Sequence, residues 1–302
     1  MLDVRWDTVK RRAHQVSRAM EWDGMVKAAG QTVVITGAAG RIGAMLRTRL
    51  PAADRVLRVV DLVPCEGGHV VDVTDLDALR AVVRGAHAIV HLAGHGLEMP
   101  WRDILETNVQ GTWCVLEAAR LEGVPRVVLA SSNQIAGMRP TPSPGDEPLP
   151  ADCPPRPGTY YGWSKAAMES LGSLFHDRFG LDVICLRIGS CFSAPPGGRG
   201  LSTWLSPDDA GRLVDAALRA PSPGFVRAWG VSANTRGIWS MTEGRELGYQ
   251  PTDDAESWAS ALPPAEPPAP GFSAAAAQAV LGGPLALAPV GQPQTLRDGY
   301  DD

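Results

Sequence analysis

Short apolar runs alternate with segments of helical periodicity from Gln31 onward. The apolar runs predict strands at residues 32–36, 56–61, 69–73, 88–93, 126–131 and 182–188. The segments between them predict helices at residues 42–50, 76–83, 103–121 and 164–179. Several strands are apolar almost throughout, as expected when helices cover both faces of a sheet. The pattern therefore predicts an α/β protein with a doubly wound parallel sheet.

Other segments lie outside this core, which we place at residues 29–194. Residues 1–28 form a polar N-terminal extension that could be an amphipathic helix. Residues 195–260 are expected to form a small subdomain, with a helix over 207–219 that Ser206 caps. Gly and Pro supply 13 of the last 40 residues, so residues 261–302 are interpreted as a Pro/Ala-rich tail. Within it, only residues 273–281 could be helical, and we expect the tail to cover the surface or to be mobile.

Composition narrows the class of protein. The 302 residues carry 28 Lys and Arg against 33 Asp and Glu, a net charge of −5, which argues against nucleic acid or an anionic membrane as partner. No apolar run is long enough for a membrane span, and the N-terminus has no signal-peptide pattern. The five Cys form no C-x-x-C pair and the six His have no metal-ligand spacing. We therefore expect a cytoplasmic protein with reduced thiols and no metal.

A glycine motif follows the first predicted strand. Gly37, Gly40 and Gly43 have the GxxGxxG spacing, with Arg41 and Ile42 opening the next helix. Such glycines let the backbone approach a pyrophosphate at the helix N-terminus, although a plain Gly-rich turn has the same letters. Asp61 ends the second strand, 18 residues after Gly43, where a carboxylate can bind the ribose hydroxyls and repel a 2′-phosphate. These positions favour NAD over NADP.

Candidate catalytic residues lie further on. Tyr161 and Lys165 have the YxxxK spacing, which puts both side chains on one face of a helix. A phenol has an ordinary pKa of about 10, and a cation about 4 Å away stabilises the phenolate by up to about 4 kcal/mol. Lys165 is therefore expected to lower the pKa of Tyr161 toward neutrality. Ser132, at the end of a strand, could hydrogen-bond the reacting oxygen.

The glycine motif, Asp61, Ser132, Tyr161 and Lys165 together resemble the extended short-chain dehydrogenase/reductase superfamily, which has a Rossmann fold. Within it, the segments Pro100-Trp101, SSNQ at 131–134, RIGSCF at 187–192 and TWLSPDD at 203–209 are similar to NAD-dependent uronate dehydrogenases. The resemblance covers residues 31–257. It implies oxidation of galacturonate or glucuronate at the anomeric carbon to a lactone, with Tyr161 as base, and association through the helices at 103–121 and 164–179.

The resemblance also implies a set of binding residues. For NAD they are Gly37, Gly40, Arg41, Ile42, Gly43, Asp61, Asp72, Val73, Leu92, Ala93, Gly94, Asn108, Ser131, Lys165 and Ile188. For the sugar acid they are Ser132, Asn133, Gln134, Ser190, Arg199 and His95. A solvated loop residue would explain Asp72 or Arg199 as simply, but the planar guanidinium of Arg199 suits a carboxylate.

Two positions depart from the family. Gly96 stands where the family has Ser, and Gln134 stands where it has His. Gln134 can still donate and accept hydrogen bonds, whereas Gly96 offers no side chain. His95 could replace the missing contact, or could be a surface histidine.

Two other functions use the same motifs. An epimerase or dehydratase would return the hydride to a nucleotide-linked or otherwise modified sugar, but it would need more basic and aromatic residues after Arg199. A regulatory module that only binds NAD would not need Tyr161 and Lys165, and both are present.

Overall fold

The computed structural model describes residues 30–50, 53–143, 145–262 and 273–294. The N-terminal extension predicted for residues 1–28 lies outside the described residues. No helix in the described part is long and apolar enough to cross a membrane.

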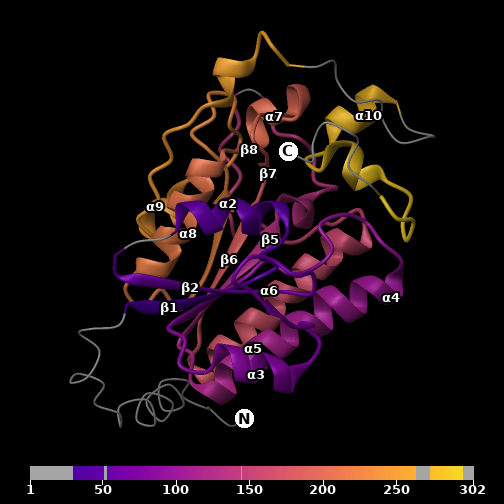
Figure 1. Cartoon of the computed structure of the whole chain (residues 1–302). Coiled ribbons are helices and arrows are strands. Elements are labelled where there is room, and N and C mark those ends of the chain that lie inside the picture. The colour runs from indigo at the N-terminus through magenta and orange to yellow at the C-terminus, as the bar shows by residue number, and fades with distance from the viewer. Residues whose placement is uncertain (1–29, 51–52, 144, 263–272, 295–302) are drawn as a thin grey trace, which may run out of the picture.

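A seven-stranded parallel sheet forms the centre of the molecule (Figure 1). Its strands, in order across the sheet, are β3 (His69–Val70), β2 (Arg55–Asp61), β1 (Gln31–Thr36), β4 (Ala88–His91), β5 (Arg126–Ser132), β6 (Asp182–Ile188) and β9 (Phe225–Gly230). The chain reverses direction across the sheet between β1 and β4, as in Rossmann folds, so ligands are expected at the carboxyl ends of these strands. The predicted doubly wound fold is confirmed.

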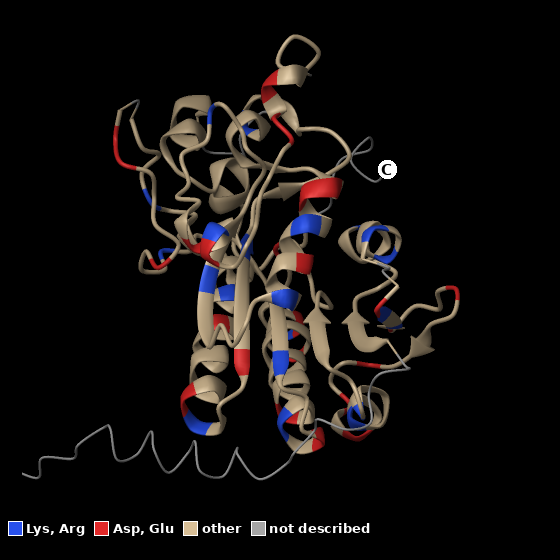
Figure 2. Cartoon of the chain, turned by 90° about the vertical axis from the view of Figure 1, so that its left-hand side faces the viewer, with Lys and Arg blue, Asp and Glu red and all other residues tan. Residues whose placement is uncertain are grey.

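Helices cover both faces of the sheet, and each face has its own apolar cluster. One layer contains α3 (Leu76–Val83), α4 (Trp101–Asp103), the π-helix η1 (Ile104–Gln110), α5 (Gly111–Glu122) and α6 (Tyr160–Phe179). The opposite layer contains α2 (Arg41–Arg49) and α8 (Pro207–Arg219). In Figure 2, basic and acidic segments are interspersed along the helices on the visible side.

Short elements complete the fold around the carboxyl edge of the sheet. They are η2 (Asn133–Ala136), β7 (Ser190–Cys191), α7 (Gly197–Thr203), β8 (Trp204–Leu205), α9 (Thr242–Glu246), η3 (Ala255–Trp258), α10 (Ala274–Ala279) and η4 (Gly283–Leu287). A domain boundary is predicted at residue 195. Beyond it, β9 still belongs to the central sheet and α8 to the helices that cover the sheet.

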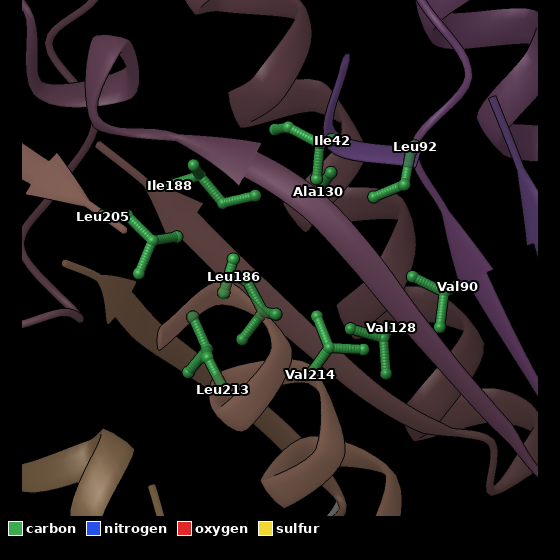
Figure 3. A pocket seen from close by; sticks show the side chains of 11 residues that line it. Ile42, Val90, Leu92, Val128, Ala130, Leu186, Ile188, Leu205, Leu213 and Val214 are labelled. Carbon is green, nitrogen blue, oxygen red and sulfur yellow. The ribbon is translucent and has the colours of Figure 1, made fainter. Parts of the chain in front are cut away.

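A cavity of about 10 Å³ lies between the sheet and α8 (Figure 3). All of its lining side chains are apolar, among them Val128, Leu186 and Val214. A space of this size and lining is expected to stay dry, so we interpret it as a packing void of the core rather than a ligand site.

Candidate active site

The first βα turn forms a cradle of glycines. Gly37 has a φ of +72°, and a Cβ there would lie 2.6 Å from the backbone nitrogen of Ala93. A Cβ on Gly43 would lie 2.2 Å from the carbonyl oxygen of Gly37, so helix and strand can pack closely only without side chains here. α2 begins after Gly40 with no side-chain cap and no acidic residue in its first turn. Its first N–H groups therefore suit the pyrophosphate of a dinucleotide.

Asp61 ends β2 beside this cradle. Its two oxygens accept hydrogen bonds from the backbone nitrogens of Ala39 and Val63, each at 2.9 Å. Each carboxylate oxygen can accept further bonds, so Asp61 can still receive the hydroxyls of an adenosine ribose. Asp72 instead accepts two bonds from Thr74 within its own turn, so its side chain is held in place without any ligand. Its contact with the cofactor stays a prediction.

Replacing Asp61 with Ser is expected to shift cofactor preference. Without the carboxylate, a 2′-phosphate is no longer repelled, so kcat/KM with NADP relative to NAD should rise about tenfold, equivalent to about 1.4 kcal/mol. Steady-state assays with both cofactors measure this ratio. Asp72→Ser is the control and should leave it within twofold; an unchanged ratio in Asp61→Ser would show that this carboxylate does not select the cofactor.

Several other predicted cofactor residues gather at the same edge of the sheet. Leu92, Ala93 and Gly94 directly follow β4, while Ile188 ends β6. Val73 lies after β3, in a chain segment that packs against Gly111. Arg41 donates from its Nε to the carbonyl of Cys191 at 3.1 Å and stacks on the ring of Phe192 at 4.0 Å. Their contact with a cofactor remains a prediction.

The three predicted catalytic residues come together where β5 meets α6. Thr159 caps α6 by accepting a bond from the nitrogen of Gly162 at 3.1 Å, so the helix begins at Tyr160. The side chain of Ser132, the last residue of β5, lies close enough to the Tyr161 hydroxyl to act on its pKa. Lys165 donates from Nζ to the carbonyl of Ala130 at 2.8 Å, and Nζ lies 5.6 Å from the centre of the Tyr161 ring.

The proton affinities of this group differ from the expectation. Burial raises the pKa of Tyr161 above 10, and the Ser132 side chain and the charge of Arg41 only partly oppose it. Burial also lowers the pKa of Lys165 to about 8. The expectation that Lys165 alone brings the pKa of Tyr161 toward neutrality is therefore wrong for the protein by itself, because desolvation of the phenol outweighs the neighbouring charges. An oxidised nicotinamide, when bound, supplies a further positive charge that acts in the lowering direction.

Arg199, on α7, is a partly buried cation. Its Nε and Nη2 both donate to the carbonyl of Leu281, and burial lowers its pKa to about 10. Among the described residues, no carboxylate lies within ion-pair distance of it. Even partial burial of a guanidinium without an acidic partner costs free energy, and an anionic ligand would relieve that cost.

Polar groups near Arg199 are partly unsatisfied. Asn133 is buried, and its Nδ2 has no hydrogen-bond partner in the part of the chain that is described. Ser190 shares a hydrogen bond of 2.8 Å with Thr203, whose hydroxyl also donates to the carbonyl of Arg199. A sugar hydroxyl could use the free donor of Asn133 and the remaining capacity of Ser190.

The two positions that depart from the family behave differently. Gln134 donates from Nε2 to the carbonyl of Gly282 at 3.0 Å, so it holds the C-terminal segment, and its role as a substrate ligand stays a prediction. At Gly96, an added Cβ would meet no atom within 4 Å, so open space lies where the family has a side chain. The backbone of His95 is bound to Asn108, while its ring shows no contact that replaces the missing serine.

Asn108 lies in η1, where the helix takes a π-turn. Its Oδ1 accepts from the nitrogen of His95, and its Nδ2 donates to the carbonyl of His95 and to Ser164. Ser164 in turn donates to the carbonyl of Tyr161 at 2.7 Å. Both donors of Asn108 are thus used to fix the loop after β4 to the catalytic helix, and its contact with the cofactor stays a prediction.

Ser131 is also bound within the protein, and its contact with the cofactor stays a prediction. Its hydroxyl donates to Glu169 at 2.7 Å, and Glu169 forms a buried two-bond ion pair with Arg187. This ion pair stabilises the end of β5 through its bond with Ser131.

The sequence did not point to Glu169, Arg187, Thr159 or Glu98 as functional residues. Only Thr159 had a local signal, as a cap residue directly before a helix.

His91, at the end of β4, makes the free energy of unfolding depend on pH. Burial, assisted by the charge of Lys165, lowers its pKa to about 3. The unfolded state, with a pKa of about 6.5, binds more protons below that pH, so stability is lost as the pH falls. We expect His91→Asn to remove about 2 kcal/mol of the loss between pH 7 and 5, measured by urea unfolding. The exposed His69→Asn is the control, and equal pH dependence in wild type and His91→Asn would contradict the assignment.

The glycine cradle, the Asp61 carboxylate beside it and the Ser132–Tyr161–Lys165 group define a Rossmann-fold enzyme that uses a nicotinamide dinucleotide. The model of the NAD dependent epimerase/dehydratase family matches residues 33–222. The chain belongs to this family.

Its relatives include dehydrogenases named for a uronate and for a sugar phosphate. The chain is 39% identical over 231 residues to a uronate dehydrogenase of Pseudomonas syringae pv. tomato, covering 74% of this chain and 82% of that protein. It is 35% identical over 250 residues to an NAD-dependent glucose-6-phosphate dehydrogenase of Haloferax volcanii, covering 74% and 94%. The crystal structure of a Y136A mutant of Agrobacterium tumefaciens uronate dehydrogenase, complexed with NAD, matches with a TM-score of 0.77 and 38% identity, covering 86% of this chain and 98% of that one.

Proposed function

We propose that this enzyme oxidises a uronate, or a closely related sugar acid, at the anomeric carbon with NAD as hydride acceptor. The observation that carries the proposal is Arg199, a partly buried cation without an acidic partner among the described residues. Arg199 and Gln134 bind the carbonyls of the adjacent residues Leu281 and Gly282, so the cation lies close to the segment that follows Ser132. The dehydrogenases of uronates among its relatives support the same substrate class.

The residues have distinct roles in this reaction. In this proposal the C1 hydroxyl of the sugar lies between Ser132 and the Tyr161 hydroxyl, and both side chains would contact it. Tyr161 would remove the proton of that hydroxyl, and NAD, when bound, would supply the acceptor for the hydride that leaves C1, so that C1 becomes the carbonyl of a lactone. Lys165 holds positive charge beside the phenol below its pKa of about 8. Arg199 binds the carboxylate through two parallel donors.

A second candidate follows from the family itself, which is described by epimerases and dehydratases. Such an enzyme would return the hydride to the sugar, and its substrate would carry a nucleotide or another modification. Here the turn at Leu281–Gly282 packs on Arg199 and Gln134, which favours a free monosaccharide over a larger ligand at this point.

The experiment is an assay of the purified protein with NAD and a set of sugars, followed by NADH absorbance. The set pairs glucuronate with glucose and galacturonate with galactose, and adds glucose 6-phosphate because a relative acts on it. Activity on the uronates only is the expected result. Preference for neutral sugars would overturn the proposal, and an isomerised sugar without net NADH would favour the epimerase.

We also propose that the enzyme is a cytoplasmic homo-oligomer. Large apolar side chains are exposed on one helical layer, namely Trp101, Trp113, Leu121, Trp163, Leu174 and Phe179. A second copy that packs α5 and α6 against the same helices would bury them. The five free cysteines agree with a reducing compartment. Light scattering should give a mass of at least two chains, and a monomer would contradict the assembly.

A further inference from the structure

The loop between β4 and α4 contains a buried carboxylate that the reaction does not use. Glu98 is 1% exposed, and no Lys or Arg of the described segments lies within ion-pair distance of it. A buried carboxylate without a cation is costly unless several donors bind it. Its partners therefore indicate what it holds in place.

Two of those partners belong to the catalytic helix. The carboxylate accepts hydrogen bonds from the backbone nitrogens of Tyr160 at 3.2 Å and Tyr161 at 2.8 Å. These are first-turn donors of α6, which have no partner within the helix. A negative charge at a helix N-terminus is also favourable for the helix dipole. Glu98 thus fixes the backbone of the residue that acts as base.

The third partner belongs to the C-terminal segment. Gly291 donates its N–H to Glu98 at 2.7 Å, and the nitrogen of Gln294 donates to the carbonyl of Glu98 at 3.0 Å. Ten residues earlier, the same segment carries the carbonyls that bind Arg199 and Gln134. One end of the segment therefore contacts the substrate-binding side chains, and the other end is attached beside the catalytic base.

The segment between these two ends fits closely against the core. A Cβ on Gly158 would lie 2.1 Å from the carbonyl oxygen of Ala286, and a Cβ on Gly282 would lie 2.3 Å from the Cβ of Ala286. A close fit of this kind requires the segment to take one position. If the segment lost its attachment at Glu98, its position beside Arg199 would therefore change as well.

We propose that Glu98 is a positioning residue that joins the first turn of the catalytic helix to the C-terminal segment, so that Tyr161 and the wall beside Arg199 are held by one carboxylate. The proposal rests on the proposed function for its kinetic consequences. Its structural consequence, attachment of residues 273–294, does not depend on any substrate.

The test compares Glu98→Gln with Glu243→Gln. The carboxamide keeps the size of the side chain but replaces one acceptor with a donor that faces N–H groups. Glu243 is a matched control because its carboxylate also accepts a backbone bond, from Ala151, away from the catalytic helix. For Glu98→Gln we expect kcat to fall at least tenfold and KM for the uronate to rise at least fivefold. KM for NAD should stay within twofold.

Hydrogen exchange followed by mass spectrometry gives the readout that needs no substrate. Exchange in residues 273–294 should become faster in Glu98→Gln and stay unchanged in Glu243→Gln. A chain that ends at Val290 keeps Glu98 but loses its C-terminal partners. The part of the segment that remains should show the same faster exchange. KM for the uronate should rise as in Glu98→Gln, with a smaller change in kcat. Unchanged exchange in both Glu98→Gln and the shortened chain would overturn the proposal. If wild type oxidised no uronate, the exchange result would still decide it.

Discussion

Tyr161→Phe is expected to lower kcat by about three to four orders of magnitude while NAD still binds. The phenol lies near Ser132 and beside Lys165, where we assign it as the base, so its removal leaves no base at the C1 hydroxyl. General acid–base catalysis contributes up to about 10⁴-fold, which sets the size of the effect. NADH formation measures turnover, and calorimetric titration with NAD measures binding.

Tyr160→Phe is the matched control for this variant. Tyr160 precedes the base in α6 and packs its ring against Trp101 with 5.0 Å between ring centres. Its hydroxyl has no part in the reaction as we describe it, so turnover should stay within twofold. Retained turnover in Tyr161→Phe would contradict the assignment of the base, and intact cellular activity in that variant would favour a protein that only binds NAD.

Arg199→Met is expected to raise KM for glucuronate by about ten- to a hundredfold. A hydrogen bond to a charged group contributes about 1.5–3 kcal/mol, and every 1.4 kcal/mol is about tenfold in affinity. The unbranched Met side chain approximates the stem of Arg without its charge. Glucose has no carboxylate for Arg199 to bind. The rate of any slow glucose oxidation should therefore be the same in Arg199→Met as in wild type.

Arg236→Met is the control for charge alone. Arg236 is a surface residue paired with Glu256 at 2.7 Å, far along the chain from the catalytic group, and its loss should leave both substrates unaffected. An equal loss on glucuronate and glucose in Arg199→Met would contradict a carboxylate contact. It would indicate instead that Arg199 only anchors Leu281.

Features carried by local spacing could be predicted from the sequence. The turn from β1 into α2 needs glycines. The apolar runs of the central strands are typical of a sheet that helices cover on both faces. α8 was expected over the residues it occupies, because Ser206 and Pro207 mark its first turn. α6 begins four residues before the predicted Ser164, since Thr159 supplies a cap that the hydrophobic pattern does not reveal.

Features that depend on distant parts of the chain could not be predicted. The third strand is only His69–Val70, because the chain leaves the sheet after it pairs with β2. β9 was missed, since its partly polar sequence becomes a strand by pairing with β6. The tail gave only a helix signal at residues 273–281, which α10 confirms in part. Its contacts with Gln134 and Arg199 join positions more than 80 residues apart, and no local pattern encodes them.

The most direct test of the proposed oxidation follows the hydrogen on C1. Glucuronate labelled with deuterium at C1 is incubated with the protein and NAD, and both products are analysed by mass spectrometry and NMR. Our account predicts deuterium at C4 of the reduced nicotinamide and a lactone that has lost the label. Deuterium that remains in the sugar, or that appears in water, would contradict hydride transfer from C1 and with it the assigned reaction.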